Sequence, residues 1–376
     1  MRCIQAERLF DGIQWRENAT ICIDDNSIVG FEAIAGVDVE RVAGTIVPGF
    51  VDVQVNGGGG VLFNDQPNVA GIAQIAQAHR RFGTTAMTPT IISDRIEVIE
   101  AAADAMALAI EAKTPGVVGV HFEGPHLSVS KKGVHSAELI RPLGAREMAQ
   151  YCRQDLGQVI VTLAPENVTL EQIQALTSAG VRVCLGHSNA TFDDAMTAIA
   201  AGACGATHLF NAMSPLQSRE PGLVGAALYS DEVTAGVIVD GHHVDYRTLE
   251  LALKIKGSDR LMLVTDAMSV VGSNQQDFIL QGRKILRSGD RLNAESGELA
   301  GCVLDMATAV HNAVKHMGCT ESQALQMASK VPAQFLGLHH KGHLSVGYDA
   351  DMLLIDNNFS VLRSWIGGQE QIHGDR

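Results

Sequence analysis

Polar side chains that can ligate a metal ion follow several apolar, strand-like runs of this sequence. Glu123 ends the run VVGVHFE, His187 follows VRVCLG, and His208 stands in GATHLF, about one strand–helix repeat after His187. One carboxylate and two imidazoles with an open coordination position form a common catalytic zinc shell. These residue types at this spacing predict a metal site built from Glu123, His187 and His208.

Zinc is the ion that this ligand set favours first, and iron(II), manganese or cobalt could occupy the same shell. A single histidine near an apolar run is more often structural than a ligand. Strand ends that together carry a glutamate, two histidines and an aspartate are harder to explain as packing alone. An ion in such a shell keeps residual positive charge, which makes a water molecule that it binds more acidic. The pattern therefore favours hydrolytic chemistry.

Two further polar groups end later strand-like runs and could handle protons or bind substrate. Asp266 follows LMLVT, where it could accept a proton from water and deliver it to a leaving group. His243 follows VIVDGH, where it could hydrogen-bond a reacting carbonyl or a substrate hydroxyl. Together with the metal ligands, these groups predict a site for acid–base catalysis.

Gln54 and Asn56 end the run FVDVQVN and project to one face, because alternate residues of a strand share a face. Two histidines at this spacing would suit a metal, but neutral amides are weak zinc ligands. The four glycines that follow, residues 57–60, lack the spacing of known phosphate-binding loops. A plain turn is favoured there, and a phosphate-cradling or mobile loop is the alternative.

The elements that must position these residues alternate between apolar strand-like runs and helical segments. Eight such repeats lie in residues 49–335, and runs that are apolar throughout are typical of parallel strands covered on both faces. We therefore predict an α/β fold with a (β/α)₈ barrel, and a doubly wound open sheet is the alternative. Residues 278–301 read as a β-hairpin excursion. Residues 1–48 and 336–376 are strand-rich and predict a small β-domain built from both termini.

Composition excludes some classes of partner. The chain carries 28 Lys and Arg against 42 Asp and Glu, a net charge of -14, which argues against binding to nucleic acid or to an anionic membrane. Hydrophobic residues make up 46%, which fits a soluble protein, and no apolar run reaches the roughly 18 residues that span a bilayer. Seven cysteines without paired spacing predict a reduced, cytoplasmic setting. An anionic small substrate would need a local basic cluster.

With these stretches placed, the sequence resembles the N-acetylglucosamine-6-phosphate deacetylases of the amidohydrolase superfamily. The resemblance rests on motifs that occur in order along essentially the whole chain: HFEGPHLS, KKGVHS, GHSNAT, THLFNAMSP, REPGLVGA, DGHHVD and LVTDAM. It implies a (β/α)₈ barrel with a small β-sandwich built from both termini. It also implies hydrolysis of the N-acetyl group of N-acetylglucosamine 6-phosphate to acetate and glucosamine 6-phosphate.

The resemblance implies roles for individual residues. Glu123, His187 and His208 match the metal ligands and Asp266 the general base and acid. His243 matches the substrate-contacting histidine of a DGxH motif, whereas His242 falls on the variable position and has no implied role. The remaining matches are substrate contacts: His135, Asn211, Ala212 and Arg219.

Arg219 matches a phosphate-binding arginine that reaches in from a neighbouring subunit, so the resemblance implies a homodimer. His135 and Arg219 are expected to grip the phosphate with positive charge. Where most amidohydrolases carry His-x-His, this chain carries Gln54 and Asn56, as a subset of these deacetylases does. We therefore predict one divalent metal per chain, with the two amides bonded to water or neighbouring groups.

Two other functions remain open at this point. One is a different amidohydrolase activity, such as that of a cyclic-amide hydrolase or an aminohydrolase. The other is a catalytically silent protein that binds sugar phosphates as a sensor. Asp266 and the full ligand set argue against the second, because binding alone needs neither.

Overall fold

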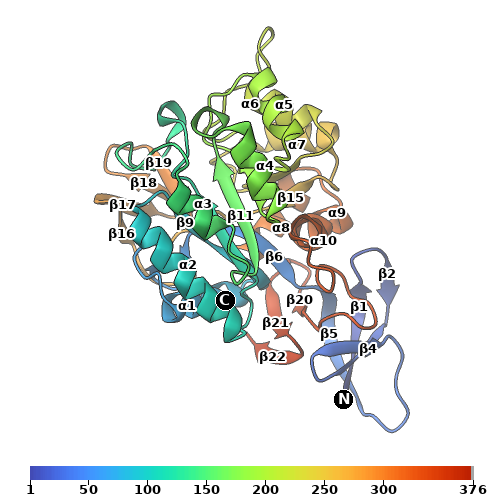
Figure 1. Cartoon of the computed structure of the whole chain (residues 1–376). Helices are drawn as coiled ribbons and strands as arrows, with labels where there is room; N and C mark the ends of the chain where they lie inside the picture. The colour runs from blue at the N-terminus through green and yellow to red at the C-terminus, as the bar shows by residue number, and fades with distance from the viewer. Residues whose placement is uncertain (374–376) are drawn as a thin grey trace.

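The computed structural model describes residues 1–373, and its centre is a parallel eight-stranded sheet closed into a barrel (Figure 1). The sheet order is β15-β14-β13-β12-β11-β10-β9-β6. A parallel bridge from Val55 to Ala267, just beyond β15, closes the ring. The predicted (β/α)₈ barrel is confirmed, and the open-sheet alternative is wrong.

The eight apolar runs expected as strands each overlap one barrel strand. Their bounds are β6 (Phe50–Val55), β9 (Thr84–Ile92), β10 (Gly119–Glu123), β11 (Gln158–Leu163), β12 (Arg182–Leu185), β13 (Gly205–Ala206), β14 (Thr234–Val237) and β15 (Leu261–Leu263).

Helices cover the outside of the barrel (Figure 1). They are α1 (Val69–Arg80), α2 (Ile96–Glu111), α3 (Ala145–Tyr151), α4 (Leu170–Ser178), α5 (Phe192–Ala200), α6 (Gly222–Tyr229), α7 (Tyr246–Lys256), α8 (Met306–His316), α9 (Glu321–Ala328) and α10 (Lys330–Leu336), with 3₁₀ turns η1 (Val129–Lys131) and η2 (Pro165–Asn167). Side-chain caps begin several of them, and Thr169, Thr191 and Thr320 each form a capping box. In the described residues, no helix is both long and apolar enough to cross a membrane.

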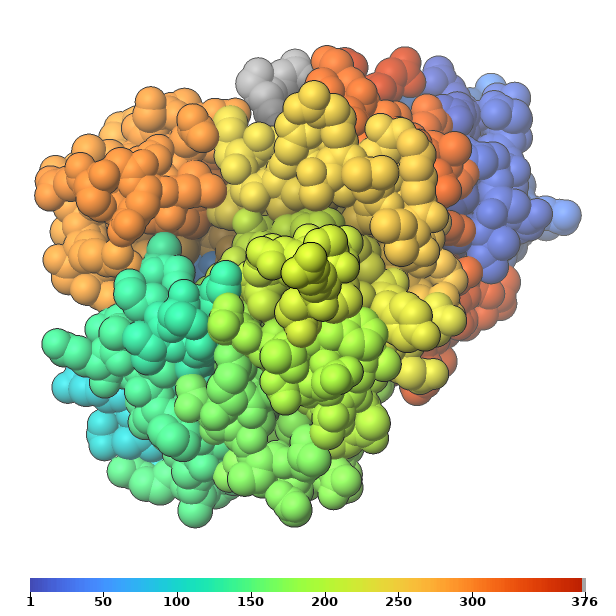
Figure 2. All heavy atoms as spheres, turned by 90° about the horizontal axis from the view of Figure 1, so that it is seen from above, coloured from blue at the N-terminus to red at the C-terminus, as the bar shows by residue number. Residues whose placement is uncertain are grey.

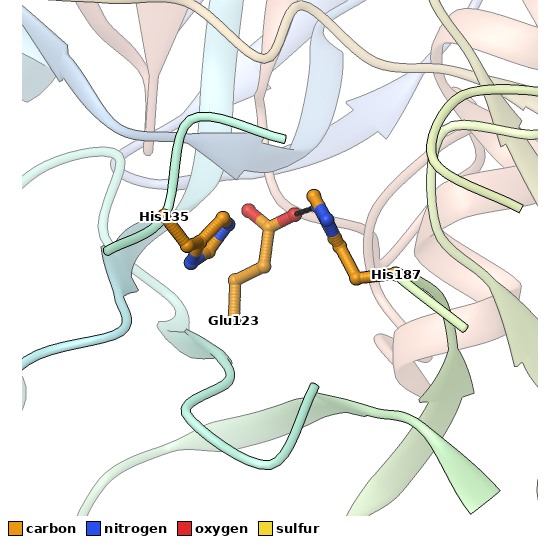
Figure 3. Close-up of side chains that lie close together, drawn as sticks. All are labelled: Glu123, His135 and His187. Carbon is orange, nitrogen blue, oxygen red and sulfur yellow. Dashed lines mark hydrogen bonds and ion pairs between the residues drawn. The ribbon is translucent and has the colours of Figure 1, made fainter. Parts of the chain in front are cut away.

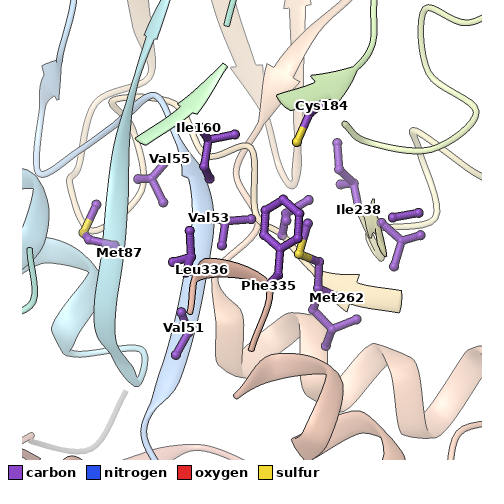
Figure 4. Packing of buried hydrophobic residues seen from close by; sticks show 14 of the residues in the cluster. Val51, Val53, Val55, Met87, Ile160, Cys184, Ile238, Met262, Phe335 and Leu336 are labelled. Carbon is purple, nitrogen blue, oxygen red and sulfur yellow. The ribbon is translucent and has the colours of Figure 1, made fainter. Parts of the chain in front are cut away.

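The barrel interior is filled by side chains and is not a pore. Val53, Ile160 and Cys184 point inward from three strands, and Phe335 of α10 packs beneath them (Figure 4). Buried apolar packing of this kind is the main source of stability in a barrel. The filled interior leaves room for a functional site only at the mouth of the barrel, where the strands reach their carboxyl ends.

Both termini contribute to one separate sheet of eight strands, ordered β22-β21-β20-β5-β1-β3-β4 with β2 paired to β1. Its strands are β1 (Arg2–Phe10), β2 (Trp15–Glu17), β3 (Thr20–Asp24), β4 (Ser27–Gly30), β5 (Val39–Pro48), β20 (Met352–Ile355), β21 (Val361–Ile366) and β22 (Gln369–Ile372).

The terminal sheet curls, because its edge strand β4 bonds to residues 347–349 just before β20. The curl encloses a second apolar core that includes Ile4, Ile21 and Trp365. The sheet pairs residues from both ends of the chain, as the sequence predicted. Residues 374–376 of the predicted terminal domain lie outside the described residues.

The segment after β15 forms more than the predicted hairpin. It is a four-stranded antiparallel sheet of β16 (Asp277–Leu280), β17 (Arg283–Ser288), β18 (Arg291–Ala294) and β19 (Leu299–Cys302). A further short pair, β7 (Gly57–Gly58) and β8 (Val61–Leu62), forms in the glycine run, which confirms a turn there.

The expectation that all seven cysteines are reduced is wrong. Cys3 and Cys22 face each other across the antiparallel pair β1–β3 and form a disulfide. Sequence spacing hid this pair, because only the strand register makes them neighbours. Five cysteines remain free, among them Cys184 and Cys302, which are buried.

Gly49 joins the terminal sheet to the barrel, and its environment yields a stability prediction. A Cβ at this position would lie 2.0 Å from Thr85 Oγ1 and 2.8 Å from Thr85 Cβ. Overpacking of this kind costs about 1–3 kcal/mol. Gly49→Ala should therefore lower the thermal midpoint, whereas Gly30→Ala, with nothing within 4 Å, should leave it unchanged. Equal midpoints for the two variants would show that the junction is loosely packed.

Candidate active site

Three metal-competent atoms meet at the mouth of the barrel. The Nε2 atoms of His187 and His208 each lie 3.0 Å from Oε1 of Glu123, and 3.0 Å from each other. All three residues are almost completely buried. The close approach of Glu123 and His187 is visible in Figure 3. The sequence prediction that these three side chains converge is therefore confirmed.

The strand ends place these side chains by unusual backbone geometry. Glu123 is the last residue of β10, while His187 and His208 follow β12 and β13 with φ of 46° and 33°. Asp266, after β15, has φ of 50°. Non-glycine residues in the left-handed region cost of order 1 kcal/mol each and are enriched at functional sites. The bends turn each side chain inward where its strand ends.

The ligand atoms fit a divalent ion. The Nδ1 of His187 donates to the backbone carbonyl of Lys131 at 2.9 Å, so Nε2 is the atom turned toward Glu123 and His208, and it can ligate an ion once it carries no proton. An ion with bonds of about 2.0–2.2 Å would bring its ligand atoms to about the separation found here. Glu123, His187 and His208 thus have the chemistry and the spacing of a three-ligand metal shell.

Electrostatics within the cluster point the same way. Burial alone favours the neutral acid, but hydrogen bonds from His187 and His208 hold the pKa of Glu123 well below its usual range. Burial opposes the charged form of His208, yet the Glu123 carboxylate raises the pKa of this imidazole. The site therefore keeps a charged carboxylate in a place closed to solvent, which suits a cation.

Gln54 and Asn56 act as hydrogen-bond donors. Gln54 Nε2 lies 3.1 Å from Glu123 Oε2 and 3.1 Å from Asp266 Oδ1, and Asn56 Nδ2 lies 2.6 Å from the same Asp266 oxygen. An amide beside a carboxylate must present its N–H, so these amide oxygens are turned away from the carboxylates. The prediction that the amides bond to neighbouring groups is confirmed.

Asp266 is half-buried within this network. Burial, followed by the negative charge of Glu123, raises the pKa of Asp266 to about 6. The positive charge of a bound cation would act in the opposite direction. A carboxyl group in this range can both accept and release a proton near neutral pH.

His243 has a partner that sequence reasoning missed. Its Nδ1 lies 2.6 Å from Oδ2 of Asp240, and Asp240 Oδ1 accepts the backbone N–H groups of His242 and His243. The signal was an aspartate three residues before the histidine, in DGHH. Asp240 fixes the ring so that Nε2 is the atom left for a ligand.

His135 lies beside the cluster, but without the predicted positive charge. One of its nitrogens lies within 4.8 Å of the ligand atoms of Glu123 and His187 (Figure 3). Burial, with the neighbouring His187, lowers the pKa of His135 to about 3, so the ring is neutral at pH 7. The expectation of a cationic histidine here is wrong, because it ignored burial.

The tautomer of His135 follows from Ser93. The backbone N–H of Ser93 donates to Nδ1 of His135 at 3.3 Å, and the Ser93 hydroxyl lies 2.8 Å from the same atom. Nδ1 is therefore an acceptor, and the ring proton is on Nε2. His135 thus offers an N–H donor, whereas His187 and His208 suit a metal better.

These residues line one cavity of about 250 Å³. Its lining contains, of the predicted residues, Asn56, Glu123, His135, His187, His208, Asn211, Ala212, His243 and Asp266, and adds Ile92, Gly133, Val134, Ile238, Met268, Leu299 and Gly301. Arg219 lies outside this lining, in an exposed loop before α6. The structure therefore brings together every predicted residue except Arg219 at the mouth of one barrel, with Gln54 directly beneath.

Comparison with known proteins gives a consistent assignment. The chain is 46% identical over 360 residues to an N-acetylgalactosamine-6-phosphate deacetylase of Shewanella sp. (strain ANA-3), covering 94% of this chain and 91% of that protein. It is 35% identical over 337 residues to an N-acetylglucosamine-6-phosphate deacetylase of Haemophilus influenzae, covering 88% and 87% of the two chains.

A solved structure and a family model extend this likeness. The crystal structure of N-acetylglucosamine-6-phosphate deacetylase from Pasteurella Multocida superposes with a TM-score of 0.94 at 34% identity, covering 99% of this chain and 100% of that one. The model of the Amidohydrolase family matches residues 45–370. The chain therefore belongs to the Amidohydrolase family.

Proposed function

We propose that the protein hydrolyses the N-acetyl group of N-acetylglucosamine 6-phosphate, releasing acetate and glucosamine 6-phosphate. The observation that carries this proposal is the position of Asp266, which shares the amide of Gln54 with Glu123 and lines the same cavity as His187 and His208. A proton-carrying group beside a metal shell suits amide hydrolysis. The relatives at 35% and 34% identity act on this substrate by name.

Glu123, His187 and His208 would hold one divalent ion. When bound, the ion supplies an acidified water and positive charge for the acetyl oxygen. Zinc is the expected ion, and iron(II), manganese or cobalt suit the same ligands. The amides of Gln54 and Asn56 support a single ion, because their N–H groups point at Asp266.

Asp266 would move the proton that the reaction needs. It accepts a proton from the attacking water as the oxygen bonds to the acetyl carbonyl carbon. It then gives this proton to the amide nitrogen, so that the C–N bond breaks with a neutral amine as the leaving group. The hydrogen bonds from Gln54 and Asn56 keep the Asp266 carboxylate in place for both steps.

His243 and His135 would bind the substrate from two sides of the cavity. Nε2 of His243 is free to bond the acetyl oxygen when protonated, or a sugar hydroxyl when neutral, while Asp240 holds its other nitrogen. His135 offers the N–H of Nε2. Asn211 and Ala212 line the wall beside them and suit the sugar phosphate.

Arg219 would reach the phosphate of a neighbouring subunit in a homodimer. It is exposed, and two large apolar residues of the same region, Leu216 and Tyr229, are 56% and 74% exposed. Exposed apolar side chains near this arginine favour contact with a second copy. An arginine can bind a phosphate through two parallel hydrogen bonds.

A cytoplasmic location fits the proposed hydrolysis of a sugar phosphate and stays a prediction.

A second candidate substrate is N-acetylgalactosamine 6-phosphate, the 4-epimer. The Shewanella relative, at 46% identity, is a deacetylase of this compound by name. Both epimers present the same acetamide and phosphate, so the machinery described here serves either. Acetate release from each, measured on one preparation, separates them by kcat/KM.

The acid–base proposal predicts the behaviour of Asp266→Asn. Acetate release should fall by about 10²–10⁴-fold, because the amide can neither accept the proton of water nor pass it to nitrogen. Metal content and substrate affinity should persist. If the variant releases acetate as fast as the wild type, Asp266 has no role in the mechanism.

The wild-type protein also separates the rival functions. Tight binding of the sugar phosphate without acetate release would favour a sensor, and turnover of other amides alone would favour a different amidohydrolase.

The ligand proposal predicts metal content. Purified wild-type protein should carry about one divalent ion per chain by elemental analysis, and His187→Ala should lose it. His242→Ala is the matched control. His242 pairs with the exposed Asp290, so this variant should keep the ion. Two ions per chain in the wild type would contradict the single-ion assignment. Full metal content in His187→Ala would remove His187 from the shell.

The phosphate proposal predicts a selective change in KM. Arg219→Ala should raise KM for the phosphorylated substrate about 10–100-fold with little change in kcat, since a charge-assisted hydrogen bond contributes about 1.5–3 kcal/mol. Arg247→Ala, another exposed arginine, is the control. A chain that is monomeric by light scattering yet sensitive to Arg219→Ala would place the arginine in its own active site.

A further inference from the structure

The four-stranded sheet β16–β19 contacts the segment that carries His135. Figure 2 shows the insertion, in orange, beside the teal segment that follows β10, with a hollow between them. Leu299 and Gly301 of the insertion line the cavity, as do Val134 and His135. The insertion is therefore part of the wall of the site.

Gln281 joins two parts of the cavity rim. Its Oε1 accepts the backbone N–H of Ser136 at 2.7 Å, and its Nε2 donates to the backbone carbonyl of Ser93 at 2.6 Å. Ser93 is the residue whose N–H and hydroxyl contact Nδ1 of His135. The Gln281 side chain thus bonds both to Ser136, which follows His135 in the chain, and to Ser93, which is the hydrogen-bond partner of the His135 ring.

Arg283 holds the other side of the same segment. Its guanidinium donates to the carbonyl of Val134 and pairs with Glu298 of the insertion at 3.0 Å. Residues 134–136 are therefore fixed at three successive points: a carbonyl, a ring nitrogen and an N–H. The insertion itself rests on the barrel through an apolar cluster that includes Leu62, Met268 and Leu280.

The backbone at Gln281 shows that turn formation alone does not favour this residue. Gln281 and Gly282 form the two-residue turn between β16 and β17, with φ of 47° and 79°. Two positive φ values define a type I′ turn, in which Asn-Gly is strongly preferred. A glutamine occupies a position that suits asparagine, and its longer side chain makes the two contacts across the rim.

We propose that Gln281, with Arg283, is a positioning residue that fixes the Nε2–H of His135 toward the substrate. The proposal rests on the proposed function for its kinetic readout. Without the hydrogen bonds of Gln281 and Arg283, residues 134–136 and Ser93 are less constrained. The Nε2–H group of His135 is then no longer held in the geometry that binds substrate. A misplacement of about 1 Å can cost about 100-fold in rate.

Gln281→Asn tests the proposal, because turn chemistry predicts a thermal midpoint equal to or above that of the wild type. We expect KM to rise about tenfold or more with metal content unchanged. Amide hydrogen exchange should quicken in peptides covering residues 129–139. Gln281→Glu should behave likewise, since its carboxylate cannot donate to the Ser93 carbonyl. Gln276→Ala, on the exposed side of the same insertion, should match the wild type in every measurement.

Unchanged KM and unchanged exchange in Gln281→Asn would overturn the proposal. A lowered midpoint with parallel losses in kcat and metal content would also overturn it, because it would show a merely structural role. Hydrogen exchange needs no substrate. If the wild type fails to release acetate, the proposed function fails, while the exchange of residues 129–139 still decides whether Gln281 holds them.

Discussion

Two carboxylates, the buried Glu123 and the half-buried Asp266, lie on either side of a single amide, and the active site depends on how their charge is compensated. Gln54 donates to both, and Asn56 adds a second donor to Asp266. Burying a carboxylate without partners is costly, so such groups either bind a proton or recruit positive charge. Glu123 recruits it from two imidazoles, and Asp266 binds a proton more readily. One environment thus produces two different carboxyl groups.

The barrel supplies this environment by bringing distant residues to one edge. Parallel strands end at the same face, so β6, β10, β12, β13 and β15 deliver side chains that are up to 212 residues apart in the chain. The strained backbone at His187, His208 and Asp266 is tolerated because the apolar core beneath holds the strands in place. The apolar core in the barrel interior thus stabilises the strained backbone of the residues at the carboxyl ends of the strands.

Sequence reasoning found the strands and the groups that face the cavity, because both leave local signals. Apolar runs identified all eight strands, and polar residues at their ends identified Glu123, His187 and Asp266. It missed Asp240, although the spacing of DGHH carried a local signal. It also missed Ser93 and Gln281, whose roles arise from contacts across the fold that leave no spacing pattern. The disulfide of Cys3 and Cys22 and the neutral state of His135 escaped for the same reason: register and burial are properties of the folded chain.

The charge of the proposed substrate links catalysis to assembly. The cavity wall combines apolar groups, amides, imidazoles and acids, and burial keeps His135 neutral at pH 7. A phosphate needs positive partners, and in an acidic chain these must be local. The exposed Arg219 loop can provide one from a second copy. In the proposed homodimer, the same cavity would bind the acetamide with residues of one chain and the phosphate with those of both, so that dimerisation would select phosphorylated sugars.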